Sequence, residues 1–185
     1  AAAVDVLDRI NMELLRDEET QLINSALDQL MKIEDVIIYG ETNTKLCDRV
    51  ASISFNITGL DHGLVAAVLN DYFNVAVRND CFCAHPYVKE MIMDDLLDYV
   101  ESVDMEDIEQ VYHLKRGMVR ASFALYSTEE DVAALIIAVK DIASRKDYYQ
   151  SQYEVDSCEN YVHKSFCFDH TQTFSVEDSI SGLVS

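Results

Sequence analysis

The chain has 185 residues, of which 34 are Asp or Glu and 14 are Lys or Arg, so its formal net charge is −20. This excess of acid argues against nucleic acid as the main partner, because phosphate binding depends on clustered Lys and Arg, and the few here are dispersed. Acids also interrupt every apolar run well short of the roughly 20 residues that span a bilayer, so we predict no membrane partner. The chain has five cysteines and no leading signal-like segment, which predicts a cytoplasmic protein.

The chain begins with a helical pattern. Apolar residues recur at helical spacing, with acids between them, from residue 4 to residue 32, which predicts one long amphipathic helix or two. These apolar residues are Val6, Ile10 and Leu14, then Leu22, Ile23, Ala26, Leu27 and Leu30. Residues 35–40, "DVIIYG", form a short β-branched run that predicts a strand followed by a turn.

Two further elements follow before the cysteine-containing segment. In "ASISFNITG", Ile53, Phe55 and Ile57 alternate with polar residues, which predicts a strand with one buried face. Asp61 can cap a helix. The apolar face of that helix would comprise Leu64, Val65, Val68, Leu69, Tyr72 and Phe73.

The segment 78–88, "RNDCFCAHPYV", is expected to be a loop, because Pro86 lacks an amide hydrogen and biases the residue before it away from helical geometry. Residues 75–77, "VAV", predict a short strand that leads into this loop. The acidic residues 89–111 that follow have a helical pattern. The simplest interpretation of these charged residues is a solvent-exposed helix face.

A strand and a helix are predicted next. In residues 117–126, "GMVRASFALY", the alternation turns Val119 and Leu125 toward the apolar face and Arg120 away from it. Ser127 and Glu130 form a capping box for the helix that follows. The inward positions of this helix would be Val132, Leu135, Ile136, Val139 and Ile142.

No period is sustained after Lys146, so we expect the Tyr- and Ser-rich residues 147–185 to be a peripheral extension. The order of the predicted elements indicates an α+β fold, in which helices cover a small, mostly antiparallel sheet.

Three interpretations compete for Cys81, Cys83 and His85. The thiols can be packing residues, since cysteine is often buried. A zinc site needs four ligands, and C-x-C-x-H supplies at most three at a tight spacing. The third interpretation is a nucleophilic thiol, which needs an electropositive and partly exposed setting. Arg78 on the same loop and Arg120 on a neighbouring strand would supply that charge.

The tail contains a separate set of potential zinc ligands. These are Cys158, His163, Cys167 and His170. Their spacing matches no zinc pattern, and no glycine knuckle accompanies them. We therefore predict no metal site, and a bound zinc in the tail stays a minor alternative.

Three stretches together resemble one family. They are "DVIIYG", "RVASISFNITGLDHGLVAAVLNDYFNVAVRNDCFCAHP" and "GMVRASFALYSTEEDVAALIIAVKDI", in this order between about residues 22 and 143. The combination of a loop arginine, a cysteine–alanine pair with a proline shortly after it, and the "VRAS" strand is specific. The chain resembles the C-terminal part of a class V aminotransferase, the fold type I pyridoxal-phosphate family that includes cysteine desulfurases and selenocysteine lyases.

The resemblance implies roles for three residues. Cys83 would attack the sulfur of the substrate and hold it as a persulfide. Arg120 would pair with the α-carboxylate of the substrate, for which a guanidinium fork is suited, and Arg78 would support the same site.

The resemblance also implies partners. Pyridoxal phosphate would be bound through a lysine on a large N-terminal domain that this chain lacks. Residues 1–146 would be the C-terminal domain, with residues 1–32 as the connecting helix, and this domain alone should be inactive. Other implied partners are an amino-acid substrate, a sulfur acceptor protein and a second copy in a homodimer.

One departure from the family pattern keeps alternatives open. Asp80 stands where the family usually has glycine; aspartate tolerates left-handed backbone better than most residues, but it adds negative charge beside a site for an anion. The chain could instead be a non-catalytic interaction module that retains the fold, with residues 89–111 and the tail as its surfaces. A transamination or lyase reaction in which Cys83 is a bystander is a further alternative.

Overall fold

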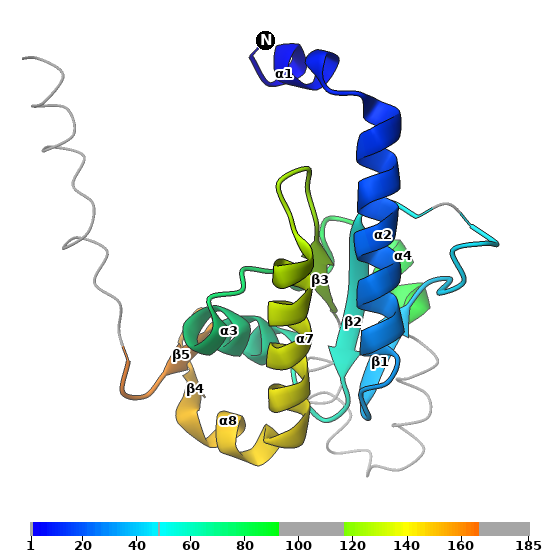
Figure 1. The fold of residues 1–185 in the computed structure, drawn as a ribbon. Coiled ribbons are helices and arrows are strands. Elements are labelled where there is room, and N and C mark those ends of the chain that lie inside the picture. The colour runs from blue at the N-terminus through cyan, green and yellow to red at the C-terminus, as the bar shows by residue number, and fades with distance from the viewer. Residues whose placement is uncertain (1, 48, 93–116, 167–185) are drawn as a thin grey trace, which may run out of the picture.

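The structure, a computed structural model, describes residues 2–47, 49–92 and 117–166 (Figure 1). Most of the acidic helix predicted for residues 89–111 therefore lies outside the described residues. Within them, no helix combines the length and the apolar content needed to cross a membrane.

A three-stranded antiparallel sheet organises the domain. Its strands are β1 (Val36–Tyr39), β2 (Ser52–Ile57) and β3 (Val119–Ser122), and β2 lies in the middle. Ile53, Phe55 and Ile57 are buried on one face of β2, as their alternation predicted. Ser52, Ser54 and Asn56 occupy the other face.

Three helices cover the apolar face of this sheet. They are α2 (Met12–Leu30), α3 (His62–Phe73) and α7 (Glu129–Ser144), and α2 and α7 lie side by side in Figure 1. Their buried residues join those of β2 and β3 in one hydrophobic core. This arrangement confirms the predicted α+β fold, in which helices cover a small antiparallel sheet.

The chain begins with two helices rather than one. α1 (Ala2–Arg9) ends before Asn11, whose side chain accepts hydrogen bonds from Glu13 N and Leu14 N and so caps α2. The predicted apolar face is buried from Leu22 to Leu30, whereas Val6 and Leu14 are 53% and 61% exposed. Figure 1 shows the reason, because α1 and the first turns of α2 project beyond the sheet and the other helices.

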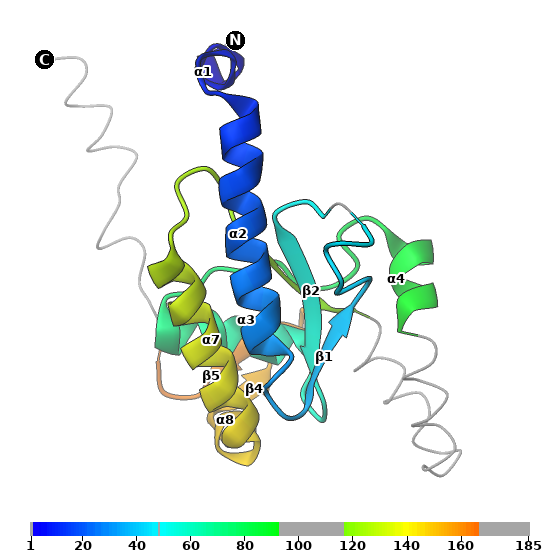
Figure 2. The same ribbon diagram turned by 45° about the vertical axis from the view of Figure 1, so that its right-hand side comes forward.

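The second face of the sheet carries a smaller cluster. Helix α4 (His85–Met91) lies on this face, opposite α2 and α7 (Figure 2). Val88 and Ile92 pack there against Tyr39 and Met118. These contacts fix the end of the cysteine loop, residues 78–84, against the sheet.

Two sequence predictions around this loop are wrong. Residues 75–77 form no strand, and only Arg78 pairs with β3, through an isolated bridge. His85 and Pro86 belong to α4 rather than to the loop. A proline is tolerated there because amide hydrogens in the first helical turn have no partner within the helix.

The capping box of α7 lies one residue later than predicted. Thr128 accepts a hydrogen bond from Asp131 N, and the Asp131 carboxylate accepts one from Thr128 N. Ser127 instead accepts a hydrogen bond from Ala124 N, which closes the preceding turn. β3 ends at Ser122, so Leu125 is 46% exposed rather than inward.

The prediction that the tail, residues 147–185, is a peripheral extension is wrong for residues 147–163. They form α8 (Lys146–Gln152) and a hairpin of β4 (Tyr153–Val155) and β5 (Tyr161–His163). Tyr149 and Tyr153 are buried in the main core. Their hydroxyls donate hydrogen bonds to Asp141 and Asp71. The domain boundary at residue 146 stays a prediction.

These tyrosines predict a loss of stability at alkaline pH. Burial, followed by the hydrogen bonds to Asp141 and Asp71, raises the pKa of Tyr149 and Tyr153, and burial beside Asp61 raises the pKa of Tyr161 to about 12. Each hydroxyl keeps its proton to higher pH when folded than when unfolded, where its pKa is about 10. Their stabilisation is therefore complete below pH 10 and declines as the pH rises toward 12.

Urea unfolding across this pH range should show the decline. The variant Tyr161→Phe should show a shallower one, whereas Tyr126→Phe, which alters an exposed residue, should leave the profile unchanged. A free energy of unfolding that stays level from pH 10 to 12 would contradict this assignment.

Candidate active site

Four residues form a row across the second face of the sheet. The register pairs Tyr39 with Ser54, Ser54 with Arg120, and Arg120 with Arg78. Because directly paired residues of antiparallel strands project from the same face, all four side chains stand on the side opposite the main core. We call Tyr39, Ser54, Arg120 and Arg78 the arginine row.

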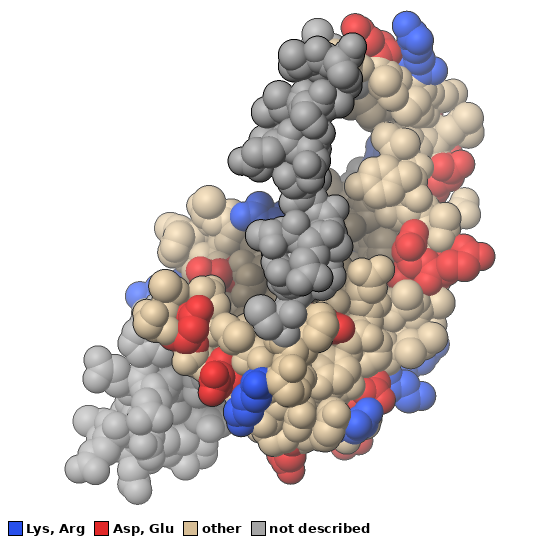
Figure 3. Space-filling view, turned by 90° about the vertical axis from the view of Figure 1, so that its left-hand side faces the viewer, with Lys and Arg blue, Asp and Glu red and all other residues tan. Residues whose placement is uncertain are grey.

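The two arginines face each other as a closely bonded pair. Arg78 N donates to Arg120 O at 3.1 Å, and Arg120 N donates to Arg78 O at 2.7 Å. Like charges placed opposite each other across two strands repel, and an anion bound between them removes this repulsion. On the molecular face in Figure 3, by contrast, Lys and Arg are scattered among Asp and Glu. The pairing thus favours a site for a carboxylate or another small anion.

Asn56 holds the beginning of β3 beside this row. Its side-chain amide donates to Gly117 O at 3.0 Å and to the Tyr39 hydroxyl at 3.2 Å, and its oxygen accepts from Val119 N at 3.3 Å. These bonds replace ladder bonds at the point where the strand starts. They fix the backbone segment that leads into Arg120.

The cysteine loop packs closely on the same backbone. Met118 N donates to Asp80 O at 3.2 Å. A Cβ at Gly117 would lie 2.7 Å from Asp80 Cα and 2.6 Å from His62 Nε2, so the loop approaches β3 at a distance that only glycine permits. Gly117 therefore has a structural role that its sequence context did not indicate.

The loop backbone is left-handed at three non-glycine residues. The φ angles of Asp80, Phe82 and Cys83 are 76°, 51° and 63°. Asp80 thus adopts the left-handed conformation that glycine favours and that aspartate tolerates better than most residues. Left-handed backbone costs an L-residue about 1–2 kcal/mol, so other contacts must compensate for this loop.

The backbone of Asp80 supports a stability prediction. Replacing Asp80 by glycine should stabilise the chain by about 0.5–1 kcal/mol, because the left-handed cost exceeds the conformational entropy that glycine loses. Asn79→Gly is the matched control, since φ of Asn79 is not positive, and it should destabilise the chain. Urea unfolding of both variants measures the difference, and equal losses would contradict it.

The two thiols of the loop have different environments. Cys81 is 7% exposed and packs in the cluster with Val88 and Met118, so the packing interpretation describes it. Cys83 is exposed. An exposed thiol can meet a substrate and a buried one cannot.

Phe82 connects the loop to the arginine row. Its ring lies 4.9 Å from Cζ of Arg120, which is a cation–π contact. Nε of Arg120 is buried and has no hydrogen-bond partner among the described residues. The residue beside Cys83 thus contacts the guanidinium for which the family resemblance implies a substrate-binding role.

A cavity of about 400 Å³ opens beside the row. Tyr39, Ser54 and Met118 line it from the sheet, and Tyr87 lines it from α4. Arg49 also lines it, and its guanidinium donates to the carbonyls of Glu41 and Ser52. The sequence analysis missed Tyr39, Ser54 and Arg49. The polar alternation in β2 could have indicated Ser54, whereas Arg49 and Tyr39 carried no comparable signal.

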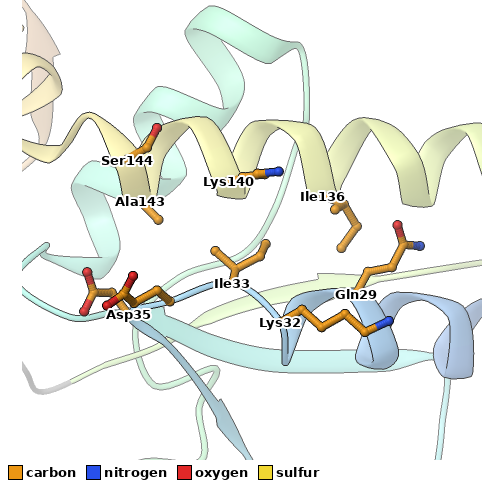
Figure 4. Close-up of a pocket in the computed structure, with 9 residues that line it drawn as sticks. Gln29, Lys32, Ile33, Asp35, Ile136, Lys140, Ala143 and Ser144 are labelled. Atoms are coloured by element: carbon orange, nitrogen blue, oxygen red, sulfur yellow. The ribbon is translucent and has the colours of Figure 1, made fainter.

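Two further cavities have no residue of the arginine row in their lining. One of about 500 Å³ lies between the end of α2 and α7, and Figure 4 shows Ile33 and Ile136 lining it with Lys32 and Lys140. It is on the helical side of the sheet. A polar cavity of about 440 Å³ is lined by Asp80 together with Cys158 of the β4–β5 turn.

The zinc alternative for the tail stays untested, because Cys167 and His170 lie outside the described residues. In the described ranges, no group of three or more His, Cys, Asp or Glu side chains could hold a metal ion. His163 there accepts hydrogen bonds at Nδ1 from the backbone of Ser165 and Phe166, and its Nε2 lies 2.8 Å from the Tyr72 hydroxyl.

Comparisons with known sequences identify relatives of this chain. The family model for aminotransferase class-V matches residues 1–135. A probable cysteine desulfurase from Halobacterium salinarum is 35% identical over 141 residues, which are 76% of this chain and 28% of that protein. Another, from Halalkalibacterium halodurans, is 31% identical over 148 residues, which are 80% of this chain and 29% of that protein.

A solved structure has the same fold over the same part of the chain. The apo structure of a cysteine desulfurase from Thermococcus onnurineus superposes with a TM-score of 0.57 at 25% identity, covering 77% of this chain and 29% of that one. The chain thus spans under a third of the length of the relatives that it matches. The sequence match and the shared fold show that this chain belongs to the class V aminotransferase family, in its cysteine desulfurase-like part.

Proposed function

We propose that this chain supplies the substrate-binding arginines and the sulfur-accepting thiol of a cysteine desulfurase. The observation that carries the proposal is the arginine row, in which Arg78 and Arg120 face each other and Phe82, next to Cys83, lies against Arg120. Selenocysteine is the alternative substrate of the same chemistry. The resemblance of this chain to cysteine desulfurases favours cysteine.

Arg120 and Arg78 bind the α-carboxylate of the substrate. A guanidinium presents two parallel N–H donors to a carboxylate, and Arg120 keeps an N–H at Nε that no described residue accepts. Binding the carboxylate also orients the rest of the amino acid. Its side-chain sulfur can then be presented to a thiol on the neighbouring loop.

Cys83 accepts the sulfur. Its thiolate attacks the sulfur of the substrate, an S–S bond forms, and the C–S bond breaks with its electron pair left on carbon. Protonation of that carbon yields alanine, and the persulfide on Cys83 holds the sulfur for an acceptor protein or for release as sulfide by a reductant. Cys83 is suited to such transfer because it is exposed on the surface.

The cavity beside the arginine row does not fit pyridoxal phosphate. This cofactor of the family needs a lysine for its Schiff base and an acid against the pyridine nitrogen, and no described lysine lines the cavity beside the arginine row. We assign the cofactor to the part of the relatives that this chain does not span. Residues 1–146 would then be the C-terminal domain of a longer, homodimeric cytoplasmic enzyme and would be inactive alone.

The experiment is a sulfide assay. The complete protein that contains this chain, loaded with pyridoxal phosphate and supplied with a reductant, should convert L-cysteine to alanine and sulfide in equal amounts. Pyruvate or an exchanged amino group as the product would indicate a lyase or a transaminase instead. No product from any amino acid would favour the non-catalytic interaction module.

A further inference from the structure

The first half of the cysteine loop is anchored to the sheet. Met118 N donates to Asp80 O, and the buried side chain of Cys81 packs against Met118 and Val88. Ala84 N then closes the turn by donating to Cys81 O at 2.7 Å. These contacts hold the loop on both sides of Phe82 and Cys83.

The tip of the loop depends on a different contact. Phe82 and Cys83 both have left-handed backbone, which is unfavourable for these residue types, and the Cys83 side chain is exposed. Phe82 is half-buried, and its ring contacts Arg120. The cation–π contact therefore compensates for backbone strain directly beside the thiol.

That contact is sensitive to an anion. The ring attracts the guanidinium through its positive charge, while the N–H edges of a guanidinium are suited to a carboxylate. A carboxylate bound at an edge neutralises the charge and weakens the attraction to the ring. The buried Nε of Arg120 adds to this effect, since exposing it to an acceptor requires its covering to move.

We propose that Phe82 is a positioning residue that couples carboxylate binding at Arg120 to release of the loop tip that carries Cys83. Without a carboxylate, Phe82 holds the tip against β3. With one bound, the strained tip separates from Arg120, and the thiol becomes free to move toward the substrate's sulfur. The inference rests on the proposed function, because it takes Arg120 as the carboxylate site.

Amide hydrogen exchange of Ala84 in the 185-residue chain tests the coupling. The bond from Ala84 N to Cys81 O spans Phe82 and Cys83, so its exchange rate reports opening of the tip. Sodium acetate is the probe, titrated against sodium chloride at constant ionic strength. Saturating acetate should raise the Ala84 rate about fivefold. Arg145, whose amide donates to Ile142 O at the end of α7, is the reference amide.

Two variants separate the cation–π contact from packing. Phe82→Leu keeps apolar bulk without a ring, and should show the raised Ala84 rate with no acetate present and no further response to it. Phe82→Tyr keeps the ring and should behave like the parent. An Ala84 rate that stays flat through the acetate titration, or that is unchanged in Phe82→Leu, overturns the proposal.

Failure of the coupling and failure of the function can be told apart. If sulfide release requires Cys83 while Ala84 exchange ignores acetate, the desulfurase function stands and the coupling is wrong. If Ala84 responds as expected but the complete protein releases no sulfide, the arginine row binds carboxylates and the desulfurase function is wrong.

Discussion

Replacing Arg120 by lysine should raise KM for L-cysteine at least about 30-fold in the complete enzyme. Lysine keeps the positive charge but loses the planar fork that binds both carboxylate oxygens, and loss of one partner from a desolvated charge pair costs about 2–5 kcal/mol. The substrate would bind weakly and in several orientations, so kcat should also fall. Steady-state kinetics of sulfide release measure both changes.

Arg145→Lys is the matched control for this substitution. Arg145 is also stacked on an aromatic ring, with Cζ 4.3 Å from the centroid of Tyr148, and pairs with Asp141 on α7. It lies outside the arginine row. Its replacement should leave KM within about twofold of the parent, whereas equal effects of the two substitutions would show that Arg120 acts only through stability.

Cys83→Ala should reduce sulfide release from L-cysteine by about three orders of magnitude, because removal of a covalent nucleophile leaves only binding and positioning. KM should change little, since the carboxylate contacts of Arg120 and Arg78 remain. The measurement is sulfide and alanine production by the complete enzyme. Sulfide release at the parent rate would assign Cys83 a bystander role.

Cys158→Ala is the control for removing an exposed thiol elsewhere in the chain. Cys158 is also exposed, in the turn between β4 and β5, and lines the polar cavity beside Asp80. Its removal should leave sulfide release unchanged. A large loss in this variant would instead indicate that the sulfur passes through the tail.

The sheet could be predicted from the sequence because strand alternation is a local signal. Ile53, Phe55 and Ile57 repeat with the period of a pleated strand, and the same period turned Arg120 away from the core. The direct pairing of Arg120 with Arg78 was not predictable, since it depends on the register between segments far apart in the chain. The row that carries the proposed function follows from that register.

The tail was mispredicted because its buried residues are tyrosines in short elements. Tyr149 and Tyr153 stand among polar residues, and α8 and β4 are too short to show a period. Both side chains are buried with their hydroxyls satisfied by carboxylates of α7 and α3. The local sequence therefore looks like a polar extension, although it completes the core.

The capping box shows a different kind of limit. Ser127 with Glu130 and Thr128 with Asp131 both have cap-forming residue types at the required spacing. Sequence alone gave no reason to prefer the second pair. Ser127 is used instead to close the turn after β3, which shifts the start of α7 by one residue.

The location of the transferred sulfur tests the central proposal most directly. The complete enzyme is incubated with L-cysteine in the absence of a reductant, and its persulfides are trapped by alkylation. The masses of its peptides are then measured by mass spectrometry. One added sulfur atom should appear on the peptide that contains Cys83 and should disappear in Arg120→Lys at low substrate concentration. Sulfur found on another cysteine, or alanine formed with Cys83 unmodified throughout, would contradict the proposal.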